Sequence, residues 1–222
     1  MKNLYVVANW KSNKTESEAK TWISQISDLI NQASNLSNKE IIVCPSFIHL
    51  SLMKAFIEEH KLPIKLGTQN ISPFDEGAYT GEINGKQIKG LAEYVLIGHS
   101  ERRKYFAETQ DLLKEKVKLA NKWNLKTIFC ADSEESLIPE GVSIVTYEPP
   151  TSISPAPPDT PENADKAAKT LKAKTSIDPI LYGGNVTSEN VSSFTQIDSI
   201  SGVLVGRASL DAKEFYAIIQ NA

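Results

Sequence analysis

The sequence predicts an α/β protein in which eight parallel strands alternate with helices and close into a single barrel. Short apolar runs recur eight times, and most are followed by a polar stretch with helical spacing. The chain has 222 residues, 41% of them hydrophobic, which is enough for one large core. That length also accommodates two small domains. Because no linker, repeat or low-complexity tract divides the sequence, we expect one domain over residues 1–222.

The eight apolar runs have the length of buried strands, and their alternation with helices favours a closed barrel over an open sheet. They occupy residues 4–8, 40–44, 64–67, 94–98, 126–130, 142–147, 179–182 and 202–205. The chain is slightly shorter than a typical barrel of this kind. Because no full helix fits between Cys130 and Val142, we expect the helix between the fifth and sixth strands to be shortened or absent.

Helical periodicity and capping residues mark several connecting segments. The clearest are residues 15–34, residues 109–123, a helix opened by Thr160 and Pro161, and residues 211–220. The proline-rich stretch 149–161 follows the sixth run and is too short for a linker, so we interpret it as a loop.

Composition excludes several classes of function. The net charge is −3 and no basic stripe appears, so nucleic acid is not an expected partner. No apolar stretch approaches the ~20 residues that span a bilayer, and the first residues lack a signal-peptide core. Two cysteines at strand ends, Cys44 and Cys130, suit a reducing cytoplasm. Neither metal-ligand spacing nor a dinucleotide fingerprint is present, so we expect no metal and no cofactor.

The fourth run is followed by a histidine at the start of a predicted helix. Apolar residues lead to Gly98 and then to His99, with Glu101 and two arginines following. Catalytic groups of such barrels lie at the carboxyl ends of the strands. A helix N-terminus disfavours the imidazolium, so His99 is expected to act as a neutral donor. Taken alone, such a histidine more often merely caps a helix, and it is the other strand ends of this chain that favour a catalytic role.

Two more runs end in ionisable residues. The first of the eight runs is followed by Asn9-Trp10-Lys11, which directs a positive charge at the barrel mouth. The sixth run is followed by Glu148. A carboxylate at the end of a buried strand is partly desolvated, which raises its pKa and suits a general base. Each residue by itself also fits a structural role, as a solvated lysine or a salt-bridged glutamate.

The last two runs end in glycine-bearing turns. Gly183-Gly184-Asn185 follows the seventh, and Gly206-Arg207 follows the eighth. Glycines let backbone N–H groups approach a phosphate, and barrels of this kind often bind phosphate after these two strands. One lysine, one histidine, one glutamate and a phosphate cradle suit proton transfer at a carbon next to a carbonyl.

From end to end, the chain resembles the triosephosphate isomerase family of TIM barrels. The matching stretches are residues 8–11 (Ala-Asn-Trp-Lys), 69–70 (Gln-Asn), 77–82 (Gly-Ala-Tyr-Thr-Gly-Glu), 97–103 (Ile-Gly-His-Ser-Glu-Arg-Arg), 147–149 (Tyr-Glu-Pro), 182–186 (Tyr-Gly-Gly-Asn-Val) and 202–206 (Gly-Val-Leu-Val-Gly). The resemblance implies cofactor-free interconversion of dihydroxyacetone phosphate and D-glyceraldehyde 3-phosphate through an enediolate, in glycolysis and gluconeogenesis. A glutamate base paired with a neutral histidine is this family's established chemistry, so the resemblance supplies that pairing.

The resemblance assigns roles to individual residues. It makes Asn9 and Lys11 substrate contacts, His99 the electrophile and Glu148 the base, with Glu101 a carboxylate near Lys11. The phosphate would be held at Ser154, Gly184, Asn185, Gly206 and Arg207.

The resemblance also implies a homodimer. Tyr79 and Thr80 would lie on a loop that inserts into the partner subunit, and Gln69 is assigned to the same dimer loop. The shortened region 131–141 is similar to compact archaeal members of the family, some of which are tetramers, so the assembly beyond a dimer is left open.

The chain departs from the family in the loop after the base. The family pattern Ile-Gly-Thr-Gly is replaced by Ile-Ser-Pro-Ala at 153–156, with more prolines around it. Ser154 keeps its backbone N–H, whereas proline has none. We expect a working but altered lid. The alternatives are a catalytically weak barrel that binds phosphorylated ligands, and an isomerase for another small phosphosugar. In the turns, Asn185 stands where serine is usual, and Arg207 replaces a glycine and is expected to point to solvent.

Overall fold

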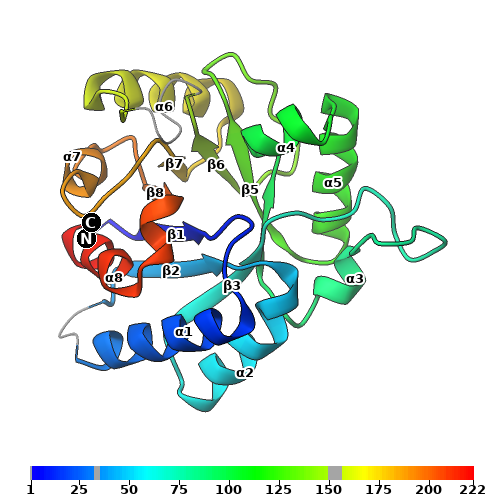
Figure 1. Cartoon of the computed structure of the whole chain (residues 1–222). Helices are drawn as coiled ribbons and strands as arrows, with labels where there is room; N and C mark the ends of the chain where they lie inside the picture. Colours follow the sequence, from blue (N-terminus) through cyan, green and yellow to red (C-terminus); the bar gives the residue numbers. More distant parts are fainter. Residues whose placement is uncertain (1, 33–35, 150–156) are drawn as a thin grey trace.

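A computed structural model describes residues 2–32, 36–149 and 157–222, and eight parallel strands in these ranges close into a barrel in chain order (Figure 1). The strands are β1 (Leu4–Asn9), β2 (Lys39–Cys44), β3 (Ile64–Thr68), β4 (Tyr94–Ile97), β5 (Lys126–Ala131), β6 (Ile144–Tyr147), β7 (Ile180–Tyr182) and β8 (Gly202–Val205). Pairing of Tyr5 in β1 with Gly202 in β8 closes the ring. The predicted fold class is confirmed.

Helices surround the strands (Figure 1). They are α1 (Glu16–Asn31), α2 (Leu50–Glu59), α3 (Gly85–Ile88), α4 (Ser100–Tyr105), α5 (Gln110–Lys122), α6 (Pro161–Thr175), α7 (Val191–Thr195) and α8 (Ala212–Asn221), with short 3-10 turns η1 (Phe47–His49) and η3 (Arg207–Leu210). The predicted cap Thr160 accepts a hydrogen bond from a backbone N–H of the first turn, and so do Thr15, Thr109 and Asp211, the first residues of three other predicted helical segments. The first helix ends at Asn31, and its predicted end at Ser34 lies outside the described residues.

The connection between β5 and β6 contains no helix. Residues 132–143 are described throughout and form only turns and irregular chain. The amide Nε2 of Gln110, at the start of α5, donates to the carbonyl oxygen of Leu137 at 2.8 Å and ties this segment to the barrel wall. The predicted shortening between the fifth and sixth strands is therefore confirmed.

The pleat of the strands carries side chains alternately into the barrel and out toward the helices. The inner cluster contains Val7, Leu96, Ile128, Ile144 and Leu204 among others. A larger outer cluster fills the space between strands and helices. Because successive inward positions are two residues apart, the inward register continues to the carboxyl ends of the strands and just beyond them. It carries Asn9 in from Val7, and Glu148 in from Ile144.

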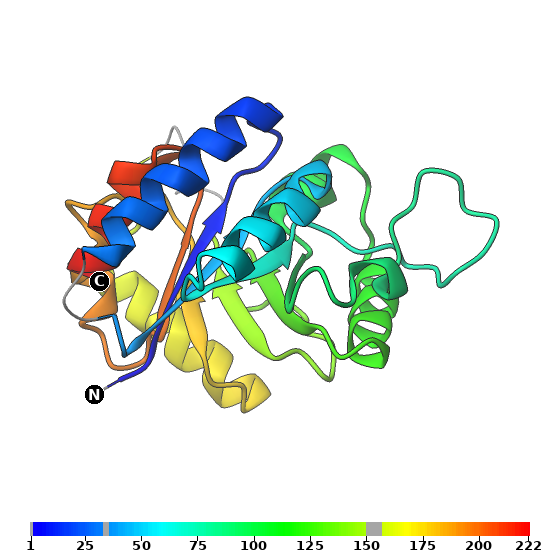
Figure 2. The ribbon, with the colours of Figure 1, turned by 90° about the horizontal axis from the view of Figure 1, so that it is seen from below.

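The segment between β3 and α3 projects away from the barrel (Figure 2). Near its tip, the rings of Phe74 and Tyr79 stack with centroids 4.3 Å apart, while Thr80 is exposed. Within the described ranges, no helix is long and apolar enough to cross a bilayer.

Candidate active site

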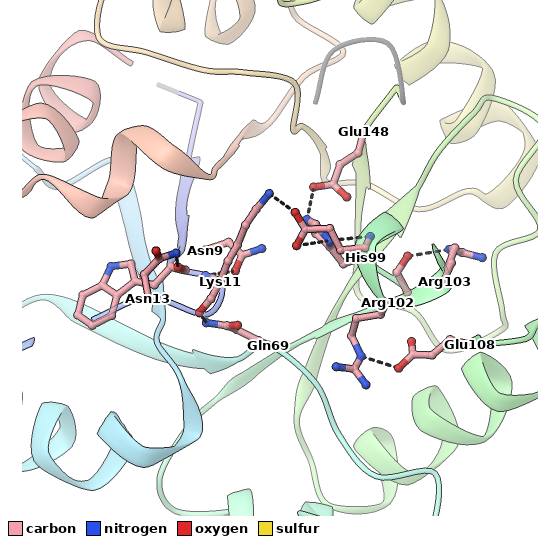
Figure 3. Close-up of polar contacts among 12 residues, drawn as sticks. Asn9, Lys11, Asn13, Gln69, His99, Arg102, Arg103, Glu108 and Glu148 are labelled. Carbon is pink, nitrogen blue, oxygen red and sulfur yellow. Dashed lines mark hydrogen bonds and ion pairs between the residues drawn. The ribbon is translucent and has the colours of Figure 1, made fainter. Parts of the chain in front are cut away.

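A cavity of about 220 Å³ lies at the carboxyl ends of the strands. Its lining includes Asn9, Lys11, His99, Glu148, Gly183, Asn185, Gly206 and Arg207. Figure 3 shows the side chains of Lys11, His99 and Glu148, from three different strand ends, converging on a common space. The structure thus brings together the lysine, histidine and glutamate selected from the sequence.

Glu148 enters the cavity directly after β6. Its side chain is only 5% exposed, and its Oε1 lies 3.5 Å from Nε2 of His99. Its Oε2 is buried and has no hydrogen-bond partner among the described residues. A buried oxygen without a partner is costly, and it is available to take a proton from a bound molecule.

His99 caps the N-terminus of α4. Its Nδ1 accepts a hydrogen bond from the backbone N–H of Glu101 at 3.3 Å. Because an accepting Nδ1 carries no proton, this bond assigns the proton of the neutral ring to Nε2. That nitrogen is the one that faces Glu148, so the imidazole presents a donor on the cavity side.

Lys11 has a left-handed backbone, with φ of 53°, which is uncommon for a residue that is not glycine. Hydrogen bonds from neighbouring side chains hold it there. Oδ1 of Asn9 accepts from the Lys11 N–H at 3.0 Å, and Nε2 of Gln69 donates to the Lys11 carbonyl oxygen at 2.9 Å. The amine Nζ then reaches Oε1 of Glu101 at 2.5 Å. Strain of this kind is typical of functional sites because it fixes where a charge is presented.

Three of the predicted phosphate residues line the cavity. Asn185 does so with a left-handed φ of 46°, and Gly206 lies next to Lys11. Arg207 also lines it and is exposed. Gly184 is not among the lining residues. Ser154 lies outside the described residues.

Gly183 has a role that the sequence analysis missed. A Cβ at this position would lie 2.6 Å from Cγ of Glu148 and 2.8 Å from Cγ2 of Thr146. Real Cβ atoms do not approach other atoms so closely, so only glycine leaves room for the Glu148 side chain in this position. The inward register of β7 was the available signal, because Gly183 stands two residues after Leu181.

Two other residues organise the strand ends. Gln69, which the sequence analysis grouped with the projecting loop, donates through Nε2 to the carbonyl oxygens of Lys11 and Cys44. Arg103 donates to the carbonyl oxygens of Gly98 at 2.7 Å and Cys130 at 3.0 Å. Because these side chains hydrogen-bond to the backbone at the ends of different strands, they fix the distances between those strand ends.

Cys130 lies inside the barrel beside Glu148. Its burial, and after that the charge of the Glu148 carboxylate, raises the pKa of the Cys130 thiol well above its usual value. It therefore remains a neutral thiol and packs as part of the inner cluster. Within the described ranges, no group of three or more His, Cys, Asp or Glu side chains is arranged to hold a metal ion.

Known proteins resemble this chain over its full length. A family model for triosephosphate isomerase matches residues 4–222. A triosephosphate isomerase from Mesomycoplasma hyopneumoniae (strain 7448) is 35% identical, with 98% of each chain covered. One from Dictyoglomus turgidum is 34% identical, with both chains covered completely, and one from Dehalococcoides mccartyi (strain BAV1) is 34% identical over 100% of this chain and 97% of its own. The chain belongs to the triosephosphate isomerase family.

Proposed function

We propose that the protein interconverts dihydroxyacetone phosphate and D-glyceraldehyde 3-phosphate without a cofactor. The observation that carries this is the facing pair of Glu148 Oε1 and His99 Nε2, 3.5 Å apart in a cavity that Lys11 also lines. A base and a neutral donor on one rim match the two tasks of this reaction, which are removal of a carbon-bound proton and stabilisation of an enediolate.

In the proposed mechanism, Glu148 takes the proton from the carbon next to the carbonyl of the bound triose phosphate. The electrons of the broken C–H bond form the carbon–carbon double bond of the enediolate. His99 donates from Nε2 to the developing oxyanion, and the Lys11 amine adds a positive charge. The hydroxyl proton on the first carbon passes to the oxyanion on the neighbouring carbon by way of Nε2 of His99, so the carbonyl forms where the hydroxyl stood. Glu148 returns the abstracted proton to the neighbouring carbon, and the site ends the cycle in its starting protonation state.

We further propose that the substrate phosphate binds at the turns that follow β7 and β8. Backbone N–H groups near Asn185 and Gly206 suit an anion, and the Arg207 guanidinium adds a charged contact. Gly184 and Ser154 belong to the same proposal by their place in the sequence. Phosphate held away from the reacting carbons supplies binding energy for the chemical step.

The projecting segment supports a homodimer as the working assembly. Tyr79 is 44% exposed, Phe74 is 43% exposed, and the two rings form a preorganised apolar pair beside Thr80. Such a pair on an extended loop suits insertion into a second copy of the chain. We infer a cytoplasmic location from the two buried free thiols, Cys44 and Cys130.

The test is steady-state isomerisation of D-glyceraldehyde 3-phosphate by the purified protein and by Glu148→Gln. Removing a positioned general base should lower kcat by about 10²–10⁴-fold. Glu140→Gln makes the same chemical change at an exposed residue and should turn over at the unmodified rate.

Two outcomes would contradict the proposal. If wild type and Glu148→Gln are equally inactive while 2-phosphoglycolate still binds, the protein is a barrel that binds phosphorylated ligands. If turnover appears only with another small phosphosugar, the reaction class stands and the substrate assignment fails.

A further inference from the structure

A second cavity, of about 600 Å³, lies at the amino ends of the strands. It is formed between the end of α2, the starts of β3 and β4, and the end of α5, and it shares no residue with the active-site cavity. Its apolar lining includes Leu62, Ile64, Leu66, Leu91 and Leu125. Its volume is within the range of about 300–1,000 Å³ that is usual for small-molecule sites.

Trp123 lines this cavity. Its Nε1 donates to Oδ1 of Asp75 at 3.2 Å. A Cβ at Gly85 would lie 2.4 Å from the indole Cδ1, so the α3 backbone packs directly on the ring. With these two contacts the indole is held in place, and the cavity has a fixed aromatic surface before anything binds.

The rim of the cavity is positively charged although the whole chain carries a net charge of −3. Four lysines and two glutamates line it. Lys54 pairs with Glu58 at 2.6 Å, and Lys65 pairs with Glu93 at 3.0 Å.

The other two lysines of the rim, Lys61 and Lys89, have no ion-pair partner among the described residues, and both are exposed. The Lys89 amine stands 5.8 Å from the centre of the Trp123 ring. A ring and an unpaired cation at one edge are the elements that a ligand with an aromatic body and an acidic group would use.

We propose that this cavity binds a small organic anion with an apolar, ring-containing body, such as an aromatic carboxylate or sulfonate. The body packs on the leucines and on Trp123, and the acidic group lies near the amines of Lys61 and Lys89. A triose phosphate has no apolar body to place there, so the cavity is not a second substrate site. Charge complementarity selects the anion, and buried apolar area supplies most of the affinity.

The test uses two probes that differ only by a sulfonate group, 8-anilino-1-naphthalenesulfonate and its uncharged analogue N-phenyl-1-naphthylamine. The sulfonate should bind saturably with one site per chain and show emission sensitised by Trp123, which is reduced in Trp123→Phe. In Lys61→Glu/Lys89→Glu its affinity should fall by about tenfold, since two nearby charges reverse sign. Affinity for the uncharged probe should change less than about twofold, because it has no charge for these lysines to attract.

Lys118→Glu/Lys213→Glu is the matched control, because it makes the same change of net charge at two exposed lysines outside the cavity. It should leave the affinity of both probes unchanged. Isomerase activity should be the same in both double variants, so failure of this proposal is distinguishable from failure of the proposed function. An unchanged near-ultraviolet circular dichroism spectrum establishes that each variant is folded.

Three results would overturn the proposal. The first is the absence of saturable sulfonate binding. The second is equal sensitivity of both probes to Lys61→Glu/Lys89→Glu. The third is displacement of the sulfonate by 2-phosphoglycolate, which would place the probe in the active-site cavity instead.

Discussion

The two ends of the barrel differ in whether their buried polar side chains have hydrogen-bond partners. In the described ranges, buried side-chain polar atoms without a partner occur on Trp10, Thr68, Ser100, Glu108, Thr146 and Glu148. All but Glu108 lie at or just beyond the carboxyl ends of strands. At the amino ends, the hydroxyl of Tyr94 donates to Glu40 and accepts from Lys126. At the amino ends these polar side chains hydrogen-bond to one another, whereas at the carboxyl ends several buried polar atoms have no hydrogen-bond partner.

Backbone strain follows the same division. At the amino ends, left-handed residues such as Asn124 and Ser176 terminate helices, where that conformation is ordinary. At the carboxyl ends, Lys11 adopts it directly after a strand, held by Asn9 and Gln69. Each unpaired buried group costs about 1–3 kcal/mol. This protein therefore concentrates its unpaired buried polar atoms and its backbone strain at the end of the barrel where a bound ligand can offset their cost.

Among the changes that test this comparison, the largest effect is expected from a single methyl group at the strained end. Gly183→Ala introduces a Cβ that collides with Cγ of Glu148, so the carboxylate must move. A displacement of the base near 1 Å is expected to lower kcat by about 10²-fold. Steady-state kinetics measures the loss, and inhibition by 2-phosphoglycolate shows whether binding is retained.

Gly90→Ala provides the control at the other end of the barrel. Gly90 has a φ of +88° with nothing within 4 Å of the added Cβ, so this change costs stability, by about 1 kcal/mol, with kcat unaltered. If Gly183→Ala behaves like Gly90→Ala, the glycine after β7 does not position the base.

The second effect appears as a pH dependence of stability. Burial raises the pKa of the Cys44 thiol far above its value of about 8.5 in an unfolded chain. The folded state therefore keeps this proton at alkaline pH while the unfolded state loses it. The free energy of unfolding falls as the pH rises above about 8.5, by about 1.4 kcal/mol per pH unit for one thiol.

Comparison with Cys44→Ala isolates this contribution, because other groups titrate alike in both proteins. Lys116, whose pKa burial lowers, acts in the opposite direction and cancels in the difference. Between pH 8.5 and 10 the gap between the two free energies of unfolding should narrow by about 2 kcal/mol. Urea unfolding at several pH values measures it, and parallel curves would show that Cys44 ionises equally in both states. Above about pH 10, the ionisation of tyrosines such as Tyr94 at the amino ends also contributes to the pH dependence of stability.

Much of the fold was predictable from the sequence because its signals are local. Apolar runs of four to six residues marked every strand, and Thr160 before Pro161 was visible as a helix cap. The absence of a helix between β5 and β6 could be predicted because the segment that connects these strands is too short to contain one. Strand ends differed by one or two residues from the prediction, as at Ile144, because pairing with a neighbour and not hydrophobicity decides where a strand begins.

The candidate site was predictable only in part. Residue types at strand ends identified Lys11, His99 and Glu148. The roles of Gly183, Gln69 and Arg103 depend on contacts between different strands, and no single stretch of sequence contains that information. Cβ clearance at Gly183 and carbonyl oxygens accepting from Gln69 exist only once the barrel has closed.

The smallest expected effect concerns Gln69, whose amide supports the strained lysine. Gln69→Met keeps the length of the side chain and removes both donated hydrogen bonds. The loss is modest because the carbonyl oxygen of Lys11 also accepts from Ser46, and that of Cys44 also accepts from the Trp10 N–H. We expect a rise in KM of about fivefold, equivalent to about 1 kcal/mol, with kcat changed less. A fall in kcat with an unchanged KM would mean that Gln69 acts on the chemical step and not on the position of Lys11.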